Sequence, residues 1–210
     1  SFLTQACLKI ITESNLLPKG SIQFIPGNLN SLLDSLTSQD VVSFTGSAET
    51  GIKIRSNPNL IRKSIKFIAE QDSLNSCILG KDITVGTIEW DLFLKEVVHE
   101  MTSKAGQKCT AIRRIFVPEK MIKDTMEALR EKLKKIRVGD PKDPKTDMGP
   151  LVSSNQKIDV LKKVSTILQE SKLVIGSDNF EKDKKFNNTG FLEPMLFNCS
   201  DPKTSKFVHD

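Results

Sequence analysis

Residues 104–110 read Lys104-Ala-Gly-Gln-Lys-Cys-Thr110, and they follow a stretch with strong helical periodicity. In that stretch apolar side chains recur at spacings of three and four residues, the pattern of one helical face: Trp90, Phe93, Leu94, Val97, Val98 and Met101. Gly106 stands where a left-handed residue commonly ends a helix. The sequence therefore predicts that a helix delivers the chain into a tight loop that carries Cys109.

Cys109 is the candidate nucleophile of this loop. A β-strand is expected directly after it, from Ile112 to Val117, so the loop would be held between two packed elements. Such a loop can keep a nucleophile still and leave its sulfur open to a substrate. Lys104 and Lys108 would also favour a thiolate nearby. The alternative is that Cys109 is a small buried hydrophobe, as free cysteines commonly are, although its polar neighbours are not a core pattern.

Three motifs together resemble one enzyme family. Gly106-Gln-Lys-Cys109 resembles the nucleophile motif of aldehyde dehydrogenases, a glycine-glutamine-x-cysteine loop after a long helix. Phe44-Thr-Gly-Ser-Ala-Glu-Thr-Gly51 resembles the family's cofactor-binding strand-to-helix turn, and Glu70 matches its general-base glutamate. The run Glu70-Gln-Asp-Ser-Leu-Asn-Ser76 departs from the family's usual glutamate-leucine-glycine-glycine. It agrees with one subgroup, the dehydrogenase half of the bifunctional ring-opening enzymes of phenylacetate breakdown (oxepin-CoA hydrolase and semialdehyde dehydrogenase).

The order of elements predicts an α/β fold with parallel sheets and flanking helices, because strands and helices alternate along the chain. The resemblance assigns residues 1–82 to the C-terminal part of an NAD(P)-binding domain and residues 83–210 to a truncated catalytic domain. The periodicity predicts helices at residues 2–14, 48–55, 118–135 and 154–169, a short one around 32–36, strands at 22–25, 41–44, 65–68, 74–79 and 172–175, and an extended piece at 191–197.

The resemblance also implies the roles of the site residues. Cys109 would attack the aldehyde, and Glu70 would activate the water that releases the acid; taken alone, Glu70 is as easily a solvated carboxylate. A turn at a helix N-terminus suits a pyrophosphate, but Phe44–Ser47 is not a G-x-G-x-x-G fingerprint, and an ordinary capped helix is the alternative. The cofactor would be NADP or NAD, held by Pro26, Gly27, Phe44, Thr45, Gly46, Ser47, Thr50 and Gln71.

Composition narrows the remaining classes. Hydrophobic residues make up 38% of the chain and charged residues 27%, which is typical of a globular protein. A net charge of +5 with interspersed signs, no Tyr and one Trp argue against nucleic-acid binding. Four cysteines without C-x-x-C spacing and two histidines give no metal site. Without a signal peptide or a membrane-length apolar run, we expect no membrane partner, a cytoplasmic location and reduced thiols.

Three functions are open at this point. The first is NAD(P)-dependent oxidation of a small-molecule aldehyde to an acid through a cysteine thioester, with a CoA-linked semialdehyde of phenylacetate catabolism as the substrate. The second is a CoA-acylating dehydrogenase, which Glu70 disfavours because CoA transfer needs no water-activating base. The third is a non-catalytic module. We also expect that both chain ends are cuts through a longer, homo-oligomeric protein, and that the 210-residue chain is inactive alone.

Overall fold

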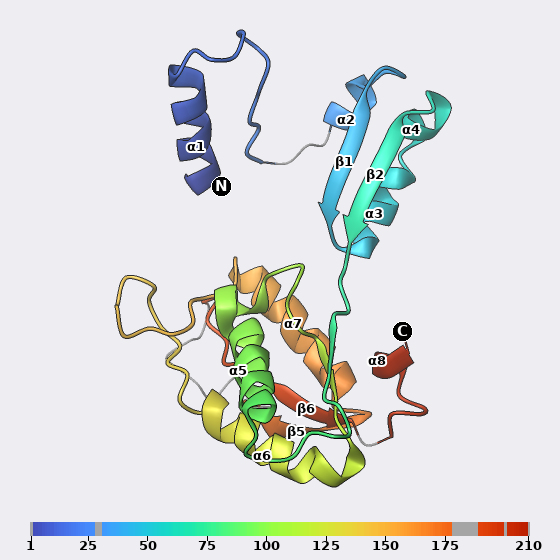
Figure 1. Cartoon of the computed structure of the whole chain (residues 1–210). Helices are drawn as coiled ribbons and strands as arrows, with labels where there is room; N and C mark the ends of the chain where they lie inside the picture. Colours follow the sequence, from blue (N-terminus) through green and yellow to red (C-terminus); the bar gives the residue numbers. More distant parts are fainter. Residues whose placement is uncertain (1, 28–30, 178–188, 200, 210) are drawn as a thin grey trace. The chain divides into compact units, whose positions relative to one another are not determined.

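The computed structural model describes residues 2–27, 31–177, 189–199 and 201–209 (Figure 1). The chain forms two compact units, Ser1–Asp72 and Ser73–Asp210, and each is described by itself. The sequence suggested a cofactor-binding domain over residues 1–82 and a catalytic domain over residues 83–210. That assignment of functions stays a prediction.

The centre of the first unit is a pair of parallel strands, β1 (Val41–Gly46) and β2 (Lys66–Gln71). Parallel strands need a crossover connection, which α3 (Ala48–Arg55) and α4 (Pro58–Arg62) provide. The helices α1 (Phe2–Glu13) and α2 (Leu32–Ser35) precede the pair, α3 has the bounds that the sequence predicted, and α1 differs from its prediction by one residue.

Two differences from the sequence prediction lie in this unit. The helix α4 was not expected, although Asn57 accepts hydrogen bonds from the amides of Asn59 and Leu60 and Pro58 opens the first turn, which is a common helix start. The strand expected at residues 22–25 is wrong. These residues bond to no neighbouring strand among the described parts of the chain, and an extended segment becomes a strand only when another strand satisfies its backbone groups.

The second unit begins with another parallel pair, β3 (Ser76–Ile78) and β4 (Arg114–Phe116). Between these strands run the predicted helix α5 (Ile88–Thr102) and a short 3-10 helix, η1 (Ser103–Gly106). Thr87 caps α5 by accepting a hydrogen bond from the amide of Trp90 at 3.3 Å. The pair therefore brings the start of β3 beside the chain that leaves the Cys109 loop.

The rest of the second unit covers α5. The 3-10 helix η2 (Glu119–Met121) leads into α6 (Ile122–Leu133), which contacts α5 and β5 (Ser171–Ile175) (Figure 1). The predicted N-cap Ser153 begins α7 (Ser154–Ile167), and α8 (Lys206–His209) ends the described chain. The strand β6 (Leu196–Cys199) pairs with β5 antiparallel. Only parallel sheets had been expected, but antiparallel neighbours need no helical crossover between them.

The apolar face of α5 forms the core of the second unit, as its periodicity predicted. Leu94 and Val97 on α5 and Leu129 and Leu133 on α6 are among the most deeply buried side chains. Full burial of such a side chain contributes about 1.5–3 kcal/mol. The core therefore anchors the helix that ends beside Cys109.

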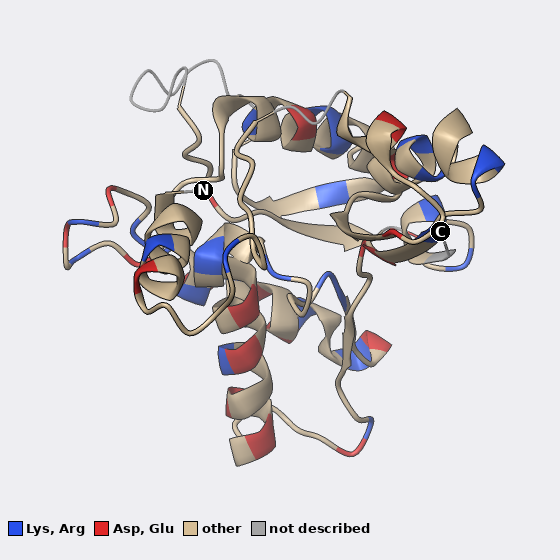
Figure 2. Ribbon diagram, turned by 90° about the horizontal axis from the view of Figure 1, so that it is seen from above, with Lys and Arg blue, Asp and Glu red and all other residues tan. Residues whose placement is uncertain are grey.

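The helix α1 has an exposed apolar surface. None of the α1 side chains is buried, and Phe2, Leu3 and Ile10 are exposed. Figure 2 shows Lys and Arg segments interleaved with Asp and Glu segments along the helices. Within the described ranges, no helix is both long and apolar enough to cross a bilayer.

Candidate active site

The Cys109 loop begins with an unusual backbone. After α5 ends, Lys104, Ala105 and Gly106 have φ values of 53°, 55° and 69°, the left-handed region that side chains other than glycine rarely adopt. The left-handed Gly106 was predicted; the two residues before it were not. A Cβ on Gly106 would lie 3.3 Å from the carbonyl oxygen of Met101, so the turn has little room for a larger residue.

Both peptide groups that flank Cys109 are held in place. The carbonyl oxygen of Lys108 accepts hydrogen bonds from the amide of Ala111 and from Nη2 of Arg113, both at 3.2 Å. The carbonyl oxygen of Cys109 accepts a bond from Nδ2 of Asn75 at 2.6 Å. The Cys109 amide has no acceptor among the described residues, and the side chain is exposed. The buried-hydrophobe alternative therefore does not hold.

Gln107 fastens the loop to a distant segment of the same unit. Its Oε1 accepts a hydrogen bond from the amide of Val152 at 2.8 Å. Its Nε2 donates to the carbonyl oxygens of Lys104 at 2.9 Å and Pro150 at 3.4 Å. The sequence alone did not predict these contacts of Gln107, although a long polar side chain inside the nucleophile motif was a signal for them.

The charge of Lys108 is compensated, contrary to what the sequence suggested. Its Nζ lies 2.7 Å from Oε1 of Glu100, and the two side chains are only 21% and 18% exposed. A close carboxylate cancels most of the field of an ammonium. Of the two lysines expected to favour a thiolate at Cys109, only the exposed Lys104 forms no ion pair among the described residues.

The cysteines differ in accessibility. Cys7 and Cys109 are exposed, while Cys77 and Cys199 are partly buried. Burial raises the pKa of the Cys77 thiol, because an apolar environment disfavours a thiolate. Cys77 contacts the core of the second unit, so its position is that of a structural residue.

The predicted cofactor turn and the predicted base lie side by side in the first unit. The register of β1 and β2 puts Thr45 opposite Glu70 and Gly46 opposite Gln71. Ligands of parallel sheets bind at the carboxyl ends of the strands, and both strands end here. The Glu70 side chain is exposed. Pro26 and Gly27 belong to the same unit, but within the described chain they form no hydrogen bond to this turn.

Two glycines allow close contacts at this turn. A Cβ on Gly46 would lie 2.5 Å from the ring of Phe44, and a Cβ on Gly51 would lie 1.7 Å from Nε2 of Gln71. Only glycine fits either position without rearrangement. The Gln71 side chain thus lies against the first turn of α3, next to the proposed cofactor residues.

The N-terminus of α3 is hydrogen-bonded to a carboxylate side chain of the same unit. Ser47 caps the helix by accepting a hydrogen bond from the amide of Thr50 at 3.2 Å, and Oδ2 of Asp72 accepts a bond from the amide of Ala48 at 3.0 Å. Helix N-termini favour negative charge, so the electrostatics of this turn suit the negative charge of a pyrophosphate. The sequence did not predict this contact of Asp72, although Asp72 stands where the family's usual motif has a glycine.

The comparisons with known proteins agree with these motifs. Residues 1–208 match the model of the aldehyde dehydrogenase family. The chain belongs to the aldehyde dehydrogenase family. It is 40% identical over 212 residues to the 3,4-dehydroadipyl-CoA semialdehyde dehydrogenase of Aromatoleum evansii, covering 100% of this chain and 41% of that protein. It is 27% identical to the 1-pyrroline-5-carboxylate dehydrogenase of Oceanobacillus iheyensis, covering 93% of this chain and 37% of the relative.

Solved structures show the same fold. Betaine aldehyde dehydrogenase of Staphylococcus aureus in complex with NAD+ matches with a TM-score of 0.81 and 25% identity, over 98% of this chain and 40% of that one. The predicted α/β, aldehyde dehydrogenase-like fold is therefore confirmed. This aldehyde dehydrogenase chain spans about two fifths of the length of the relatives it matches.

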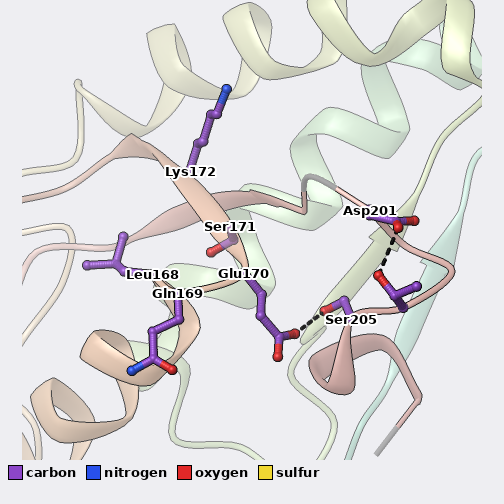
Figure 3. A pocket seen from close by; sticks show the side chains of 8 residues that line it. Leu168, Gln169, Glu170, Ser171, Lys172, Asp201 and Ser205 are labelled. Carbon is purple, nitrogen blue, oxygen red and sulfur yellow. Dashed lines mark hydrogen bonds between the residues drawn. The ribbon is translucent and has the colours of Figure 1, made fainter.

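One hollow in the second unit of this aldehyde dehydrogenase chain lies away from the predicted residues. A cavity of about 550 Å³ lies between the start of β5 and residues 201–205 (Figure 3). Oε2 of Glu170 accepts hydrogen bonds there from Oγ of Ser205 and the amide of Lys206, both at 2.9 Å. The cavity is lined by none of the predicted site residues. Across the described residues, no cluster of His, Cys, Asp and Glu could hold a metal ion.

Proposed function

We propose that the protein carrying this chain oxidises an aldehyde to a carboxylic acid through a thioester on Cys109. The observation that carries this proposal is the exposed thiol on a loop whose flanking carbonyl groups are both bonded. The Cys109 thiolate attacks the aldehyde carbon and forms a C–S bond, and the carbonyl oxygen takes the negative charge. A bound NAD(P)+ supplies an acceptor for the hydride that leaves this carbon.

The backbone of Cys109 supports the first step. Its amide N–H has no acceptor within the described chain, so it is available to the oxyanion that forms when the thiolate attacks. A single donor of this kind contributes about a hundred- to a thousand-fold to the rate. Because the loop is already fixed, the donor needs no rearrangement when the charge develops.

Glu70 has the role of base in this proposal. Its carboxylate takes a proton from a water molecule, the water oxygen attacks the thioester carbon, and the thiolate of Cys109 leaves with release of the acid. Its position beside the cofactor turn supports this role. A CoA-acylating dehydrogenase would have no use for this base, because CoA and not water takes the acyl group. Glu70 therefore ranks CoA transfer behind hydrolysis, as the second candidate function.

We propose that NADP or NAD is held at the end of β1 and the start of α3. Gly46 and Ser47 would lie at the phosphates, with Thr50 under the adenosine, Gln71 beside the turn and Pro26 and Gly27 at the adenine. Phe44 and Thr45 complete the strand end. The Asp72 carboxylate at the Ala48 amide would share this positive end of the helix with the pyrophosphate.

The substrate class that we propose is a CoA-linked semialdehyde. Support comes from the 40% identical relative, whose name gives such a substrate; phenylacetate catabolism is the finer proposal.

We also propose a homo-oligomer, with residues 1–82 in the cofactor domain and residues 83–210 in the catalytic domain. Four free cysteines favour a reducing compartment such as the cytoplasm.

Rapid-mixing kinetics of the full-length protein test the proposal. An aldehyde and NAD(P)+ should give a burst of reduced cofactor followed by turnover without CoA. Cys109→Ser should abolish the burst, and Cys199→Ser, a change at a partly buried thiol, should preserve it. Turnover only with CoA would identify an acylating enzyme. If no aldehyde gave reduced cofactor, with or without CoA, the protein would be a non-catalytic module of this fold.

A further inference from the structure

The side chain of Asn75 is hydrogen-bonded to the Cys109 loop. Its single Nδ2 donates to the carbonyl oxygen of Cys109 at 2.6 Å and to that of Ala111 at 3.1 Å. A carboxamide nitrogen carries two hydrogens, so both donors are used within the loop. Asn75 lies just before β3, in the same compact unit as the loop.

The backbone of Asn75 holds the other end of the same segment. Its carbonyl oxygen accepts hydrogen bonds from the amides of Arg113 at 2.9 Å and Arg114 at 3.1 Å. These bonds extend the pairing of β3 with β4 by one step beyond Ser76 and Arg114. One residue therefore binds the chain at four points between residues 109 and 114.

The side-chain bonds act on the orientation of the thiol. The bond to the carbonyl oxygen of Cys109 fixes the peptide group after the nucleophile, and the bonds to the Lys108 carbonyl oxygen fix the one before it. With both peptide groups held, the Cα–Cβ direction of Cys109 and the direction of its N–H are set. A cysteine on an unrestrained loop would present its sulfur and its oxyanion donor in many geometries.

We propose that Asn75 is a positioning residue for Cys109, an inference that rests on the proposed thioester chemistry. Asn75 touches no reacting atom; it holds the nucleophile and its amide in the geometry of attack. A displacement of about 1 Å can lower a rate about a hundred-fold. Loss of the two side-chain donors should therefore slow hydride release strongly, and by more than the accompanying loss of stability alone would explain.

The chain contains a matched control. Nδ2 of Asn59 also donates to two carbonyl oxygens, those of Leu33 at 2.8 Å and Leu36 at 3.0 Å. Asn59 and Asn75 are both partly buried, but Asn59 lies outside the Cys109 loop. Asn59→Ala and Asn75→Ala thus delete the same kind of interaction, and Asn75→Asp keeps the shape while removing both donors.

The test uses the full-length protein and three readouts. In Asn75→Ala and Asn75→Asp the burst rate constant should fall about a hundred-fold, while cofactor affinity stays at the wild-type value. Iodoacetamide should still alkylate Cys109 readily, because the thiol stays exposed. Hydrogen exchange should quicken at residues 111–114 in both variants. Asn59→Ala should lower the melting temperature similarly and leave the burst and this exchange unchanged.

Each opposite result overturns one specific statement. An unchanged burst in Asn75→Asp, or an equal loss in Asn59→Ala, would remove the positioning role. Unchanged exchange at residues 111–114 in Asn75→Ala would do the same without any aldehyde being needed. If wild-type protein shows no burst but the exchange changes as expected, the proposed function fails and the structural role of Asn75 stands.

Discussion

The Lys108 ammonium and the Glu100 carboxylate form a mostly buried ion pair, 2.7 Å apart, that ties the residue before Cys109 to α5. The other carboxylate oxygen, Oε2 of Glu100, is buried without a hydrogen-bond partner among the described residues. The pair is therefore vulnerable to the loss of either member.

The first prediction concerns this pair. Lys108→Met should destabilise the protein by about 1–3 kcal/mol, because it leaves a desolvated carboxylate without its partner. Glu100→Gln in the same chain should recover part of the loss, since no buried charge then remains. Urea unfolding of both single variants and the double variant measures the coupling. A double variant as unstable as the sum of the singles would show that the two residues do not interact.

The second prediction concerns Glu70. In the full-length protein, Glu70→Gln should leave the burst of reduced cofactor intact and slow steady turnover, by about a hundred-fold or more, because water loses its base. The measurement is rapid mixing followed by steady-state assay. Glu13→Gln, a change at an exposed carboxylate of α1, is the control. Steady turnover at the wild-type rate would rule out Glu70 as the base.

The third prediction concerns Asp72. Asp72→Asn should tighten cofactor binding about two- to fivefold at low salt, because a charge near a helix N-terminus is worth about 0.3–1 kcal/mol. The carboxylate now bonded to the Ala48 amide repels the pyrophosphate that we place there. Calorimetric titration of NAD and NADP measures the change, which should shrink as salt is added. Weaker binding in the variant would place the phosphates elsewhere.

The fourth prediction concerns pH. Hydrogen bonds from the side chain and amide of Arg137 lower the pKa of Asp147 to about 2. A carboxyl whose folded pKa is lowered adds stability above its unfolded pKa, near 4, and that stability is lost as the pH falls through about 2. Asp147→Asn should therefore flatten the decline of melting temperature between pH 4 and 2. Asp159→Asn, at a looser surface pair with Lys162, should preserve the wild-type decline.

Local sequence patterns predicted the elements well. The apolar spacing from Trp90 to Met101 gave α5, and Ser153 marked the start of α7, because caps and helical faces are properties of neighbouring residues. The strand at residues 22–25 failed for the complementary reason: a strand depends on a partner that the segment itself does not encode. The antiparallel pairing of β6 with β5 likewise depends on the direction in which the chain comes back to β5, and the spacing of apolar residues gives no information on that direction.

The site was predictable only in part. Cys109 and Glu70 stand in recognisable motifs, whereas the hydrogen bond of Asn75 to Cys109 joins residues 34 positions apart. Asp72 reaches the Ala48 amide from 24 positions away. Such bonds follow from the pairing of strands, and the pairing is known only once the fold is. The charge compensation of Lys108 was missed because Glu100 lies eight residues upstream, on α5, and the left-handed turn at residues 104–106 brings the two side chains together.

The register of β1 and β2 has a consequence for how this protein can change in length. Thr45 faces Glu70 because of strand pairing, and not because 25 residues separate them. Insertions in the turn at residues 56–57, between α3 and α4, lengthen a surface connection and leave the pairing unchanged. A single deletion inside β2, between Lys66 and Glu70, would rotate the carboxylate to the opposite face of the sheet. Among homologues, gaps should therefore fall in the connection and not in the strand.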